Sequence, residues 1–288
     1  DWWYRVLRRF VGADANNHGD GVRMTNPICE QLPINEIVCG DNVATMQTFP
    51  DDSIDLVVTS PPYDNLRTYG GHSWDFEGVA QQLWRVIKPG GVVVWVVADA
   101  TIDGSETGTS FRQALRFMEI GFRLHDTMIW DKGGFASVGD LAARYAPVTE
   151  FMFVLSHGKP STFVPLKDRK NIHAGKPIGG TILDKDGKSR PVSNIGKPLA
   201  EFGQRFNLWS IPPDKLSPHP APFPEALARD HILSWSNEGD IVLDPFSGSG
   251  TTAKMARLMG RQFIGIEINP EYCAIARKRL RQQVLEFA

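Results

Sequence analysis

The chain has 288 residues, of which 42% are hydrophobic and 22% are charged. Such a chain can bury a sizeable core, which excludes global disorder and predicts one large α/β domain or a domain with a long insertion. No apolar run reaches the roughly 20 residues that a membrane helix needs, so no membrane segment is expected. Three cysteines without a Cys-X-X-Cys spacing predict no metal site or disulfide framework, and they favour a reducing, cytoplasmic compartment.

Charge is distributed unevenly along the chain. The formal net charge is −2, yet residues 157–215 contain eleven Lys and Arg against five Asp and Glu. A basic region inside an otherwise acidic protein fits a contact with nucleic acid. A solvated loop surface is the alternative.

The hydrophobic pattern alternates between strands and helices. Short apolar runs predict strands at 36–39, 55–58, 92–97, 122–130 and 150–155, and helical spacing predicts helices at 43–49, 76–87 and 111–120. Lys88-Pro89-Gly90-Gly91 is expected to end the second helix. Cys39 in the first strand and Cys273 near the end of the chain are both expected to be small core residues.

The region 157–215 is rich in Gly, Pro, Lys and Ser and shows little periodicity. After it the pattern predicts helices at 223–235, 251–259 and 272–285, with strands at 241–243 and 263–266. No internal repeat is recognised. The alternation of strands and helices predicts a doubly wound α/β sheet.

The downstream run Asp244 to Thr252 reads Asp-Pro-Phe-Ser-Gly-Ser-Gly-Thr-Thr. It lies between a strand and a helix, the local geometry of a nucleotide-type cofactor site, and its glycines let backbone approach a ligand. Thr251 and Thr252 are expected to supply N-cap hydroxyls. The Asp244 carboxylate would repel a pyrophosphate but suits an ammonium group, and Glu267, about twenty residues further on, can accept both ribose hydroxyls. These features describe S-adenosylmethionine better than NAD or ATP; a Rossmann dehydrogenase is the alternative.

The upstream run Ser60-Pro61-Pro62-Tyr63 follows a buried-strand pattern. It is a rigid turn at the edge of the sheet where ligands of open α/β folds bind, and its prolines leave backbone carbonyls free to face a ligand. A serine hydroxyl and a carbonyl can together accept both protons of an exocyclic amine, while Tyr63 offers a face for stacking. A purely structural turn is the alternative.

Together these motifs resemble those of the amino-methylating DNA methyltransferases, which methylate N6 of adenine or N4 of cytosine. The order is that of the β class, with the catalytic motif first, the targeting region next and the cofactor motif last. The resemblance runs from about residue 34 to residue 285. It also includes Gly40-Asp41, Trp84 to Gly91, Ile129 to Lys132, and His219 to Glu225.

The resemblance implies a Rossmann-like, S-adenosylmethionine-dependent methyltransferase sheet of circularly permuted order with an irregular basic target-recognition insertion. It divides the chain into an N-terminal arm (1–33), a catalytic half (34–132), a target-recognition region (133–210, with one sheet strand near 150–155) and a cofactor-binding half (211–288). Asp41 is expected to bind the adenine amine and His219 the amino-acid end of the cofactor. The implied cofactor residues are Asp41, Asp244, Pro245, Phe246, Gly248, Gly250, Thr251, Thr252, Glu267 and His219.

Ser60 bears on the choice of base. The family's adenine enzymes usually have aspartate at the first position of this tetrapeptide and the cytosine-N4 enzymes usually have serine, so the resemblance favours cytosine N4, with adenine N6 as the alternative. The base would leave the duplex, stack on Tyr63, bond to Ser60 and the Pro61 carbonyl, and be methylated by direct in-line attack. Trp130 is either a neighbour of the flipped base or a core residue.

Double-stranded DNA is the expected partner. The candidate DNA contacts in the insertion are Arg169, Lys170, Asn171, Arg190 and Asn194, most of the basic ones meeting phosphates. A homodimer and a cognate restriction endonuclease stay open. The more distant alternatives are methylation of RNA or of a protein amide, and a non-catalytic DNA-binding relative.

Overall fold

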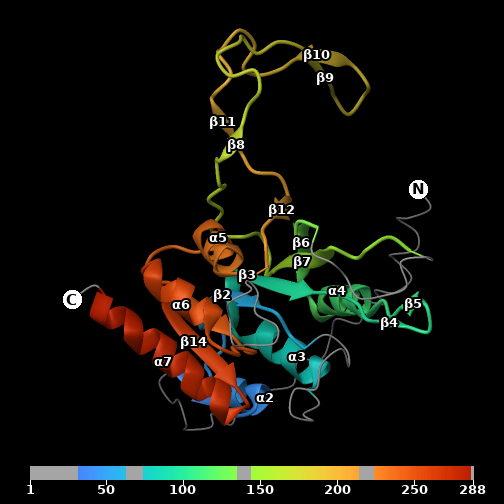
Figure 1. Cartoon of the computed structure of the whole chain (residues 1–288). Helices are drawn as coiled ribbons and strands as arrows, with labels where there is room; N and C mark the ends of the chain where they lie inside the picture. The colour runs from blue at the N-terminus through green and yellow to red at the C-terminus, as the bar shows by residue number, and fades with distance from the viewer. Residues whose placement is uncertain (1–31, 63–73, 135–143, 214–223, 287–288) are drawn as a thin grey trace, which may run out of the picture.

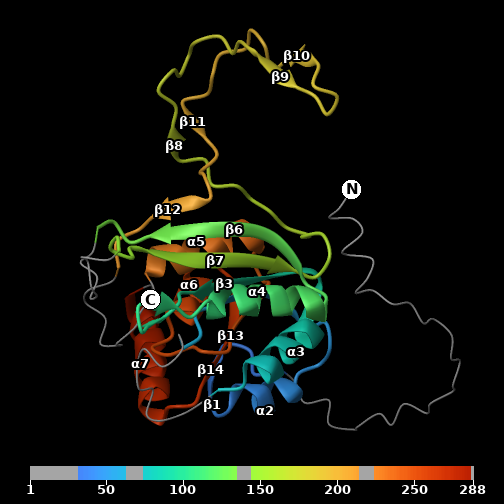
Figure 2. The same ribbon diagram turned by 90° about the vertical axis from the view of Figure 1, so that its right-hand side faces the viewer.

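A computed structural model describes residues 32–62, 74–134, 144–213 and 224–286 (Figures 1 and 2). Its centre is an eight-stranded mixed sheet with helices on both faces. In spatial order the strands are β1 (Glu36–Cys39), β14 (Gln262–Glu267), β13 (Ile241–Asp244), β2 (Ile54–Thr59), β3 (Ile87–Val97), β7 (Thr149–Ser156), β6 (Arg123–Asp131) and β12 (Leu208–Ser210). All neighbours are parallel except β3–β7 and β7–β6.

This order confirms the predicted doubly wound α/β fold. β13, which precedes the cofactor motif, comes late in the chain but lies inside the sheet between β14 and β2. The chain order is therefore permuted relative to the spatial order. The helices are α2 (Asn42–Gln47), α3 (Phe76–Val86), α4 (Thr109–Ile120), α5 (Glu225–Trp235), α6 (Thr251–Leu258) and α7 (Pro270–Glu286).

The central strands supply two hydrophobic cores, one on each face of the sheet, because successive side chains of a strand point to opposite sides. Leu56 and Val58 of β2 join the core formed with α5, α6 and α7. Val57, between them, joins the core formed with α2, α3 and α4, together with Trp95 of β3. Burial on both sides explains why these strands are almost wholly apolar rather than alternating.

The segment Lys88-Pro89-Gly90-Gly91 ends α3 as predicted, since that helix stops at Val86. It is not a loop, however, because it belongs to β3. Pairing with β2 shifts register there, Gly90 has φ +84°, and a Cβ on Gly91 would lie 2.9 Å from the carbonyl oxygen of Asp55. The glycines thus let the strand start against its neighbour's backbone.

Residues 157–213 contain more regular structure than their composition predicts. β12 adds an edge strand parallel to β6, which the sequence analysis missed. Before it, the chain forms a narrow two-stranded arm that projects from the sheet (Figures 1 and 2). The arm pairs β8 (Arg169–Lys170) with β11 (Phe202–Gly203), and further out β9 (Thr181–Leu183) with β10 (Ser189–Pro191). A separate small hairpin joins β4 (Thr101–Ile102) to β5 (Ser105–Glu106).

The base of the arm is fixed by Arg205. Its guanidinium bonds to Asp168 on the outgoing chain and, at 2.7 Å, to the buried Asp230 of α5. It also lies over the ring of Trp209, 4.8 Å from the centroid. The Arg205 amide donates to the carbonyl of Leu166 at 2.8 Å. The outgoing and returning segments of the arm therefore lie side by side where they join the body of the protein.

The two described cysteines differ from each other. Cys273 is buried in α7 as predicted, whereas Cys39 is exposed at the end of β1, so its assignment to the core was wrong. β1 is an edge strand and Cys39 is its last residue, so its side chain is open to solvent although its thiol contacts that of Cys273. Among the described residues, no helix is long and apolar enough to cross a bilayer.

His231 of α5 is fully buried beneath the base of the arm. Its ring stacks on Trp209 with centroids 4.4 Å apart, its Nε2 lies 3.3 Å from the Met152 sulfur, and its Nδ1 has no partner among the described residues. Burial lowers the pKa of His231 to about 3, with a smaller contribution from the charge on Arg205. The ring is therefore neutral in the folded protein.

We predict that His231→Phe reduces the loss of stability in mild acid. The folded pKa is below the ordinary value of 6.5, so the histidine's stabilising contribution is complete above pH 6.5 and is lost as pH falls towards 3. The wild type should lose about 1.4 kcal/mol per pH unit from this group below pH 6. Urea unfolding at pH 7 and pH 5 measures the difference, and an identical pH dependence in both proteins would contradict the prediction.

Candidate functional site

The two sequence motifs lie side by side because β2 and β13 are parallel neighbours. Leu243 pairs with Val57. The Ser60 turn and the Asp244 turn therefore leave the sheet at the same edge, the one formed by the carboxyl ends of the parallel strands. The Thr59 hydroxyl donates to Asp244 Oδ1 at 2.6 Å and joins the two strand ends directly. Parallel sheets of this kind bind ligands at that edge.

Asp244 is a buried carboxyl group whose hydrogen-bond partners, Thr59, the Phe246 amide and the Thr252 side chain, are all uncharged. It is 2% exposed, and Oδ1 also accepts a bond from the Phe246 amide at 3.1 Å. Burial raises the pKa of Asp244 to about 6, although the bond from Thr59 opposes the shift. A buried carboxylate that is costly to ionise favours a positively charged neighbour.

The turn after Asp244 needs its glycines. Gly248 and Gly250 have φ of 49° and 81°, a region that side chains disfavour. A Cβ on Gly250 would lie 2.9 Å from the Cβ of Ala276, so this glycine also lets α7 pack against the turn. The amide of Gly250 donates to the Ser247 carbonyl at 2.7 Å, which closes the turn.

The expectation that Thr251 and Thr252 cap α6 was wrong. The N-cap is Gly250, which has no side chain to make a capping bond. Both threonines are buried, and the Thr252 hydroxyl instead donates to the carbonyl of Val58 at 3.1 Å. Because Thr252 bonds to β2, it adds a second link between the two motifs.

Glu267 ends β14 beside this turn and is held rigidly. Its Oε2 accepts from the Gly248 amide and its Oε1 from the Asn269 amide, each at 2.8 Å. The Gly40 amide donates to its carbonyl at 3.0 Å, which places Asp41 directly after the neighbouring strand. Asp41 itself caps α2 by accepting from the Ala44 amide at 2.8 Å.

Neighbouring side chains complete the surroundings of the turn. The Asn42 side-chain amide donates to the Pro245 carbonyl at 3.2 Å and ties α2 to it. Phe246 meets Trp74 edge to face, with centroids 5.0 Å apart, and Trp95 at 6.2 Å. Sequence reasoning missed Trp74, whose only signal was an aromatic residue just before a helix.

The predicted catalytic tetrapeptide, Ser60 to Tyr63, is described only in part. Ser60 and Pro62 are half-buried and Pro61 is buried, directly after β2. Tyr63, and His219 of the cofactor set, lie outside the described residues. Trp130 is a core residue, because it is buried and its Nε1 donates to the Ile211 carbonyl at 2.8 Å.

The candidate DNA contacts fall into two groups. Asn171 is only 9% exposed and donates to the Ala200 carbonyl at 2.8 Å, while Arg169 donates to the Gln204 carbonyl and lies over the Phe206 ring. Their side chains hold the arm together, so base reading by Asn171 does not fit this arrangement. The candidates with exposed side chains are Lys170, Arg190 and Asn194.

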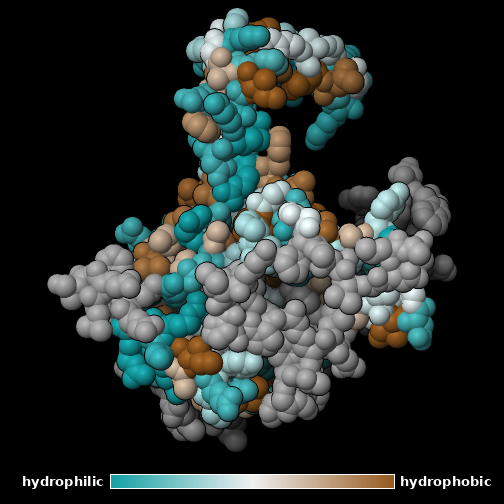
Figure 3. Space-filling model, viewed as in Figure 1, coloured by the Kyte–Doolittle hydropathy of each residue, from teal (hydrophilic) through white to brown (hydrophobic). Residues whose placement is uncertain are grey.

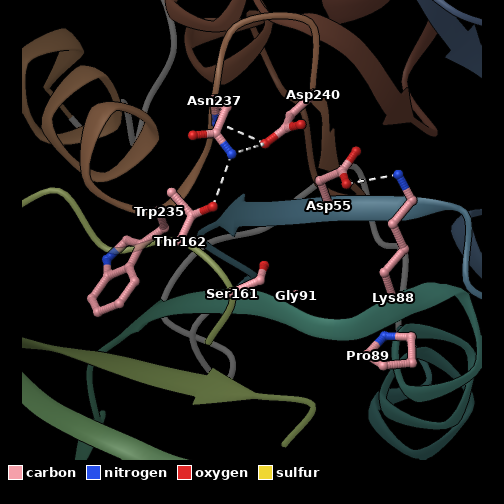
Figure 4. A pocket seen from close by; sticks show the side chains of 9 residues that line it. All are labelled: Asp55, Lys88, Pro89, Gly91, Ser161, Thr162, Trp235, Asn237 and Asp240. Atoms are coloured by element: carbon pink, nitrogen blue, oxygen red, sulfur yellow. Dashed lines mark hydrogen bonds and ion pairs between the residues drawn. The ribbon is translucent and has the colours of Figure 1, made fainter. Parts of the chain in front are cut away.

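A polar hollow of about 100 Å³ lies at the opposite edge of the sheet, where β2 and β13 begin (Figure 4). Asp55 there accepts from Lys88 at 2.7 Å and from the Ile241 amide at 2.9 Å, and Asn237 bonds to Thr162 and Asp240. These paired groups join loops to the strand starts. No cluster of three or more potential metal ligands occurs in the described part of the chain.

Comparison with known proteins decides the family. The family model described as DNA methylase, for N6 and N4 methyltransferases, matches residues 54–278. The chain belongs to this DNA methylase family. It is 55% identical over 247 residues to the orphan methyltransferase M.BamHII of Bacillus amyloliquefaciens, covering 82% of this chain and 91% of that protein. The resemblance stated from the sequence is thus confirmed.

Two further relatives of this DNA methylase are informative. The DNA adenine methyltransferase YhdJ of Escherichia coli is 30% identical over 259 residues, covering 85% of this chain and 82% of its own length. The solved structure of a putative DNA modification methylase from Thermus thermophilus, complexed with S-adenosylmethionine, is 27% identical with a TM-score of 0.59. The match covers 86% of this chain and 94% of that one. The fold and the class of cofactor agree with the expectation from the sequence.

We predict that Asp244→Asn stabilises the methylase in the absence of cofactor. Asparagine keeps an oxygen for Thr59 and Phe246 but has no charge to bury. The folded pKa of about 6 exceeds the ordinary 3.8, so ionisation of Asp244 costs stability fully above pH 6 and not at all below about pH 4. The variant should gain about 2 kcal/mol at pH 8 and almost nothing at pH 4.

Denaturant unfolding at both pH values measures this gain. Asp103→Asn, at an exposed position, is the matched control and should change stability little at either pH. A variant less stable than wild type at pH 8 would show that the carboxylate is compensated by its surroundings.

Proposed function

We propose that this DNA methylase transfers a methyl group from S-adenosylmethionine to N4 of a cytosine in double-stranded DNA. Membership of the DNA methylase family is shown, whereas the choice of cytosine is the proposal. It is carried by one observation: Ser60 follows β2 at the sheet edge where Asp244 ends β13. A serine at this position is typical of the family's cytosine-N4 enzymes.

The residues present fit the cofactor. The buried Asp244 offers a negative charge to an ammonium group, the backbone of Gly248 and Gly250 leaves space, and the fixed carboxylate of Glu267 has lone pairs left for two hydroxyls. Asp41, Pro245, Phe246, Thr251, Thr252 and His219 remain proposed contacts. When bound, S-adenosylmethionine supplies an electrophilic methyl group that an amino nitrogen can accept directly.

Ser60 and the backbone of Pro61 orient the acceptor. The Ser60 hydroxyl and the Pro61 carbonyl accept hydrogen bonds from the two amino N–H groups, which turns the nitrogen lone pair out of the ring plane. The nitrogen forms one bond to the methyl group and loses one of its two protons to solvent. Tyr63 stacks on the base after it leaves the duplex, an extrusion that costs a few kcal/mol. The chain's main contribution is positioning, which can lower the barrier by about 7–11 kcal/mol in favourable cases.

Neither of the two cysteines in the described residues provides a nucleophile for this reaction. Burial raises the pKa of the Cys273 thiol to about 12, and its sulfur donates to the Glu267 carbonyl at 3.3 Å. Cys39 is exposed at the end of β1 rather than beside Ser60. Direct transfer without a covalent enzyme intermediate therefore fits the described residues best.

Adenine N6 is the second candidate acceptor. It is favoured by the 30% identity to a protein named as a DNA adenine methyltransferase. Both reactions need the same orientation of an exocyclic amine, so the described residues serve either. A homodimer, a cognate endonuclease and the boundary of the target-recognition region at 133–210 remain predictions.

The test is incubation with S-adenosylmethionine and mixed-sequence duplex DNA, followed by mass spectrometry of the nucleosides. We expect N4-methylcytosine, and we expect Ser60→Ala to lower the rate about 100-fold, because one oriented acceptor is lost. Ser161→Ala, at the opposite edge of the sheet, is the matched control and should keep the wild-type rate.

N6-methyladenine as the product would overturn the choice of base and leave the methyltransferase chemistry intact. An unchanged rate in Ser60→Ala would contradict the role given to that hydroxyl. No methylated nucleoside, on DNA that the protein binds, would contradict the proposed acceptor.

A further inference from the structure

The arm contains a short repeat that the sequence analysis did not recognise. Gly175-Lys176-Pro177-Ile178 on the outgoing chain matches Gly196-Lys197-Pro198-Leu199 on the returning chain. Four residues are too few to stand out as a repeat in 288. The structure makes the match evident, because the two segments pair with each other through an antiparallel bridge between Pro177 and Pro198.

The backbone bonds of the two segments obey a local two-fold axis. The Gly175 amide donates to the Leu199 carbonyl at 2.8 Å, and the Gly196 amide donates to the Ile178 carbonyl at 2.7 Å. The Ile178 amide donates to the Lys197 carbonyl at 2.8 Å, and the Leu199 amide donates to the Lys176 carbonyl at 2.9 Å.

The turns that lead into the two segments follow the same symmetry. The Lys176 amide donates to the His173 carbonyl and the Lys197 amide to the Asn194 carbonyl, both at 3.1 Å. Gly175 and Gly196 share a φ of 80°, a left-handed conformation that each turn requires. The unit is thus a symmetric pair of turns rather than an irregular loop.

This symmetry places the two lysines on one face of the arm. The two-fold axis of an antiparallel pair runs perpendicular to the ribbon, so it keeps each face of the ribbon on its own side. Lys176 and Lys197 are exchanged by that axis and hence share a face. Both are exposed, and among the described residues neither forms an ion pair or a side-chain hydrogen bond.

The surroundings favour a contact with another molecule. The outer part of the arm, its head (residues 172–199), carries apolar patches above a hydrophilic stem on the face shown in Figure 3. Ile172 is 94% exposed beside one turn, and Ile195 is exposed within the other. Asp184 on the hairpin accepts from the amides of Asp186 and Lys188, so its carboxylate is engaged within its own turn.

We infer that Lys176 and Lys197 form a symmetric clamp on duplex DNA, each holding a phosphate of a different strand. This rests on the proposed function, since it requires DNA as the substrate. The two strands of a duplex are antiparallel and related by local two-fold axes that pass into the grooves, which is why two-fold proteins match palindromic sites. A two-stranded ribbon also fits the major groove.

In the clamp, the residues that bind phosphates differ from those that could distinguish base sequences. The lysines are identical in the two halves and contact phosphates, which carry no sequence information. The positions of His173 and Asn194 are equivalent but their side chains differ, so the symmetry is broken there. Ala174 and Ile195, and Ile178 and Leu199, are further equivalent positions with different side chains, so these positions and not the two lysines could distinguish the two half-sites.

The first test measures binding of the full chain to a labelled 30-base-pair duplex of mixed sequence by fluorescence anisotropy at several KCl concentrations. Each phosphate contact contributes about 0.9 to the slope of log K against log salt. Lys176→Ala and Lys197→Ala should each reduce the slope by about 0.9, and the double variant by about 1.8. Lys278→Ala, an exposed lysine on α7 far from the arm, is the matched control (Figure 1).

Equal losses in the two single variants support the clamp. An unchanged slope, or a loss in only one of them, overturns it. If wild-type protein methylates DNA while the lysine variants bind normally, the clamp fails and the proposed function stands. If wild type methylates no base, the proposed function fails independently.

The second test assigns the strands by phosphate ethylation interference on a duplex containing a site that the enzyme methylates. Lys176→Ala should remove interference at a phosphate on one strand and Lys197→Ala at a phosphate on the other. Loss on the same strand for both variants would overturn the two-strand arrangement.

Discussion

The parallel pairing of β2 with β13 is the constraint on which the site depends. These strands lie far apart in the chain, and each ends in one of the two motifs. Their register brings the Ser60 turn and the Asp244 turn to one edge, where Thr59 and Thr252 bond across from one motif to the other. The arrangement of the two motifs depends on which strands are neighbours in the sheet and not on their order along the chain. A circularly permuted chain can therefore bring the same strand ends together.

At Asp244 the burial that is proposed to favour cofactor binding also lowers the stability of the folded protein. Its carboxyl group is buried where ionisation is costly, yet the same burial strengthens its attraction for a cationic ligand. The carboxylate of Glu267 differs from that of Asp244, because two backbone amides donate to it and fix its position. The charge of Asp244 is therefore poorly compensated by its surroundings, whereas the position of the Glu267 carboxylate is fixed by its two backbone bonds.

Local patterns predicted most of the fold, since apolar runs and glycine turns identified the central strands, the helices and the family. Features that depend on partners distant in sequence were missed. β12 is a three-residue edge strand recognisable only beside β6, and Thr252 looks like a helix cap until β2 is placed next to it. The symmetric turns of the arm are defined by bonds between two segments that separately look like loops. The roles given to individual site residues remain predictions.

The arm leaves and rejoins the methylase body at neighbouring points, with Leu166 and Arg205 joined by a backbone bond. An insertion whose ends lie together places little demand on the sheet, whatever its length or sequence. Arg205 holds that junction to α5 through Asp230, independently of what the head contains. Replacing everything between the two anchor points would therefore exchange the proposed recognition element for another while the sheet and its proposed cofactor edge stay unaltered, which makes the junction a natural site for grafting new specificities.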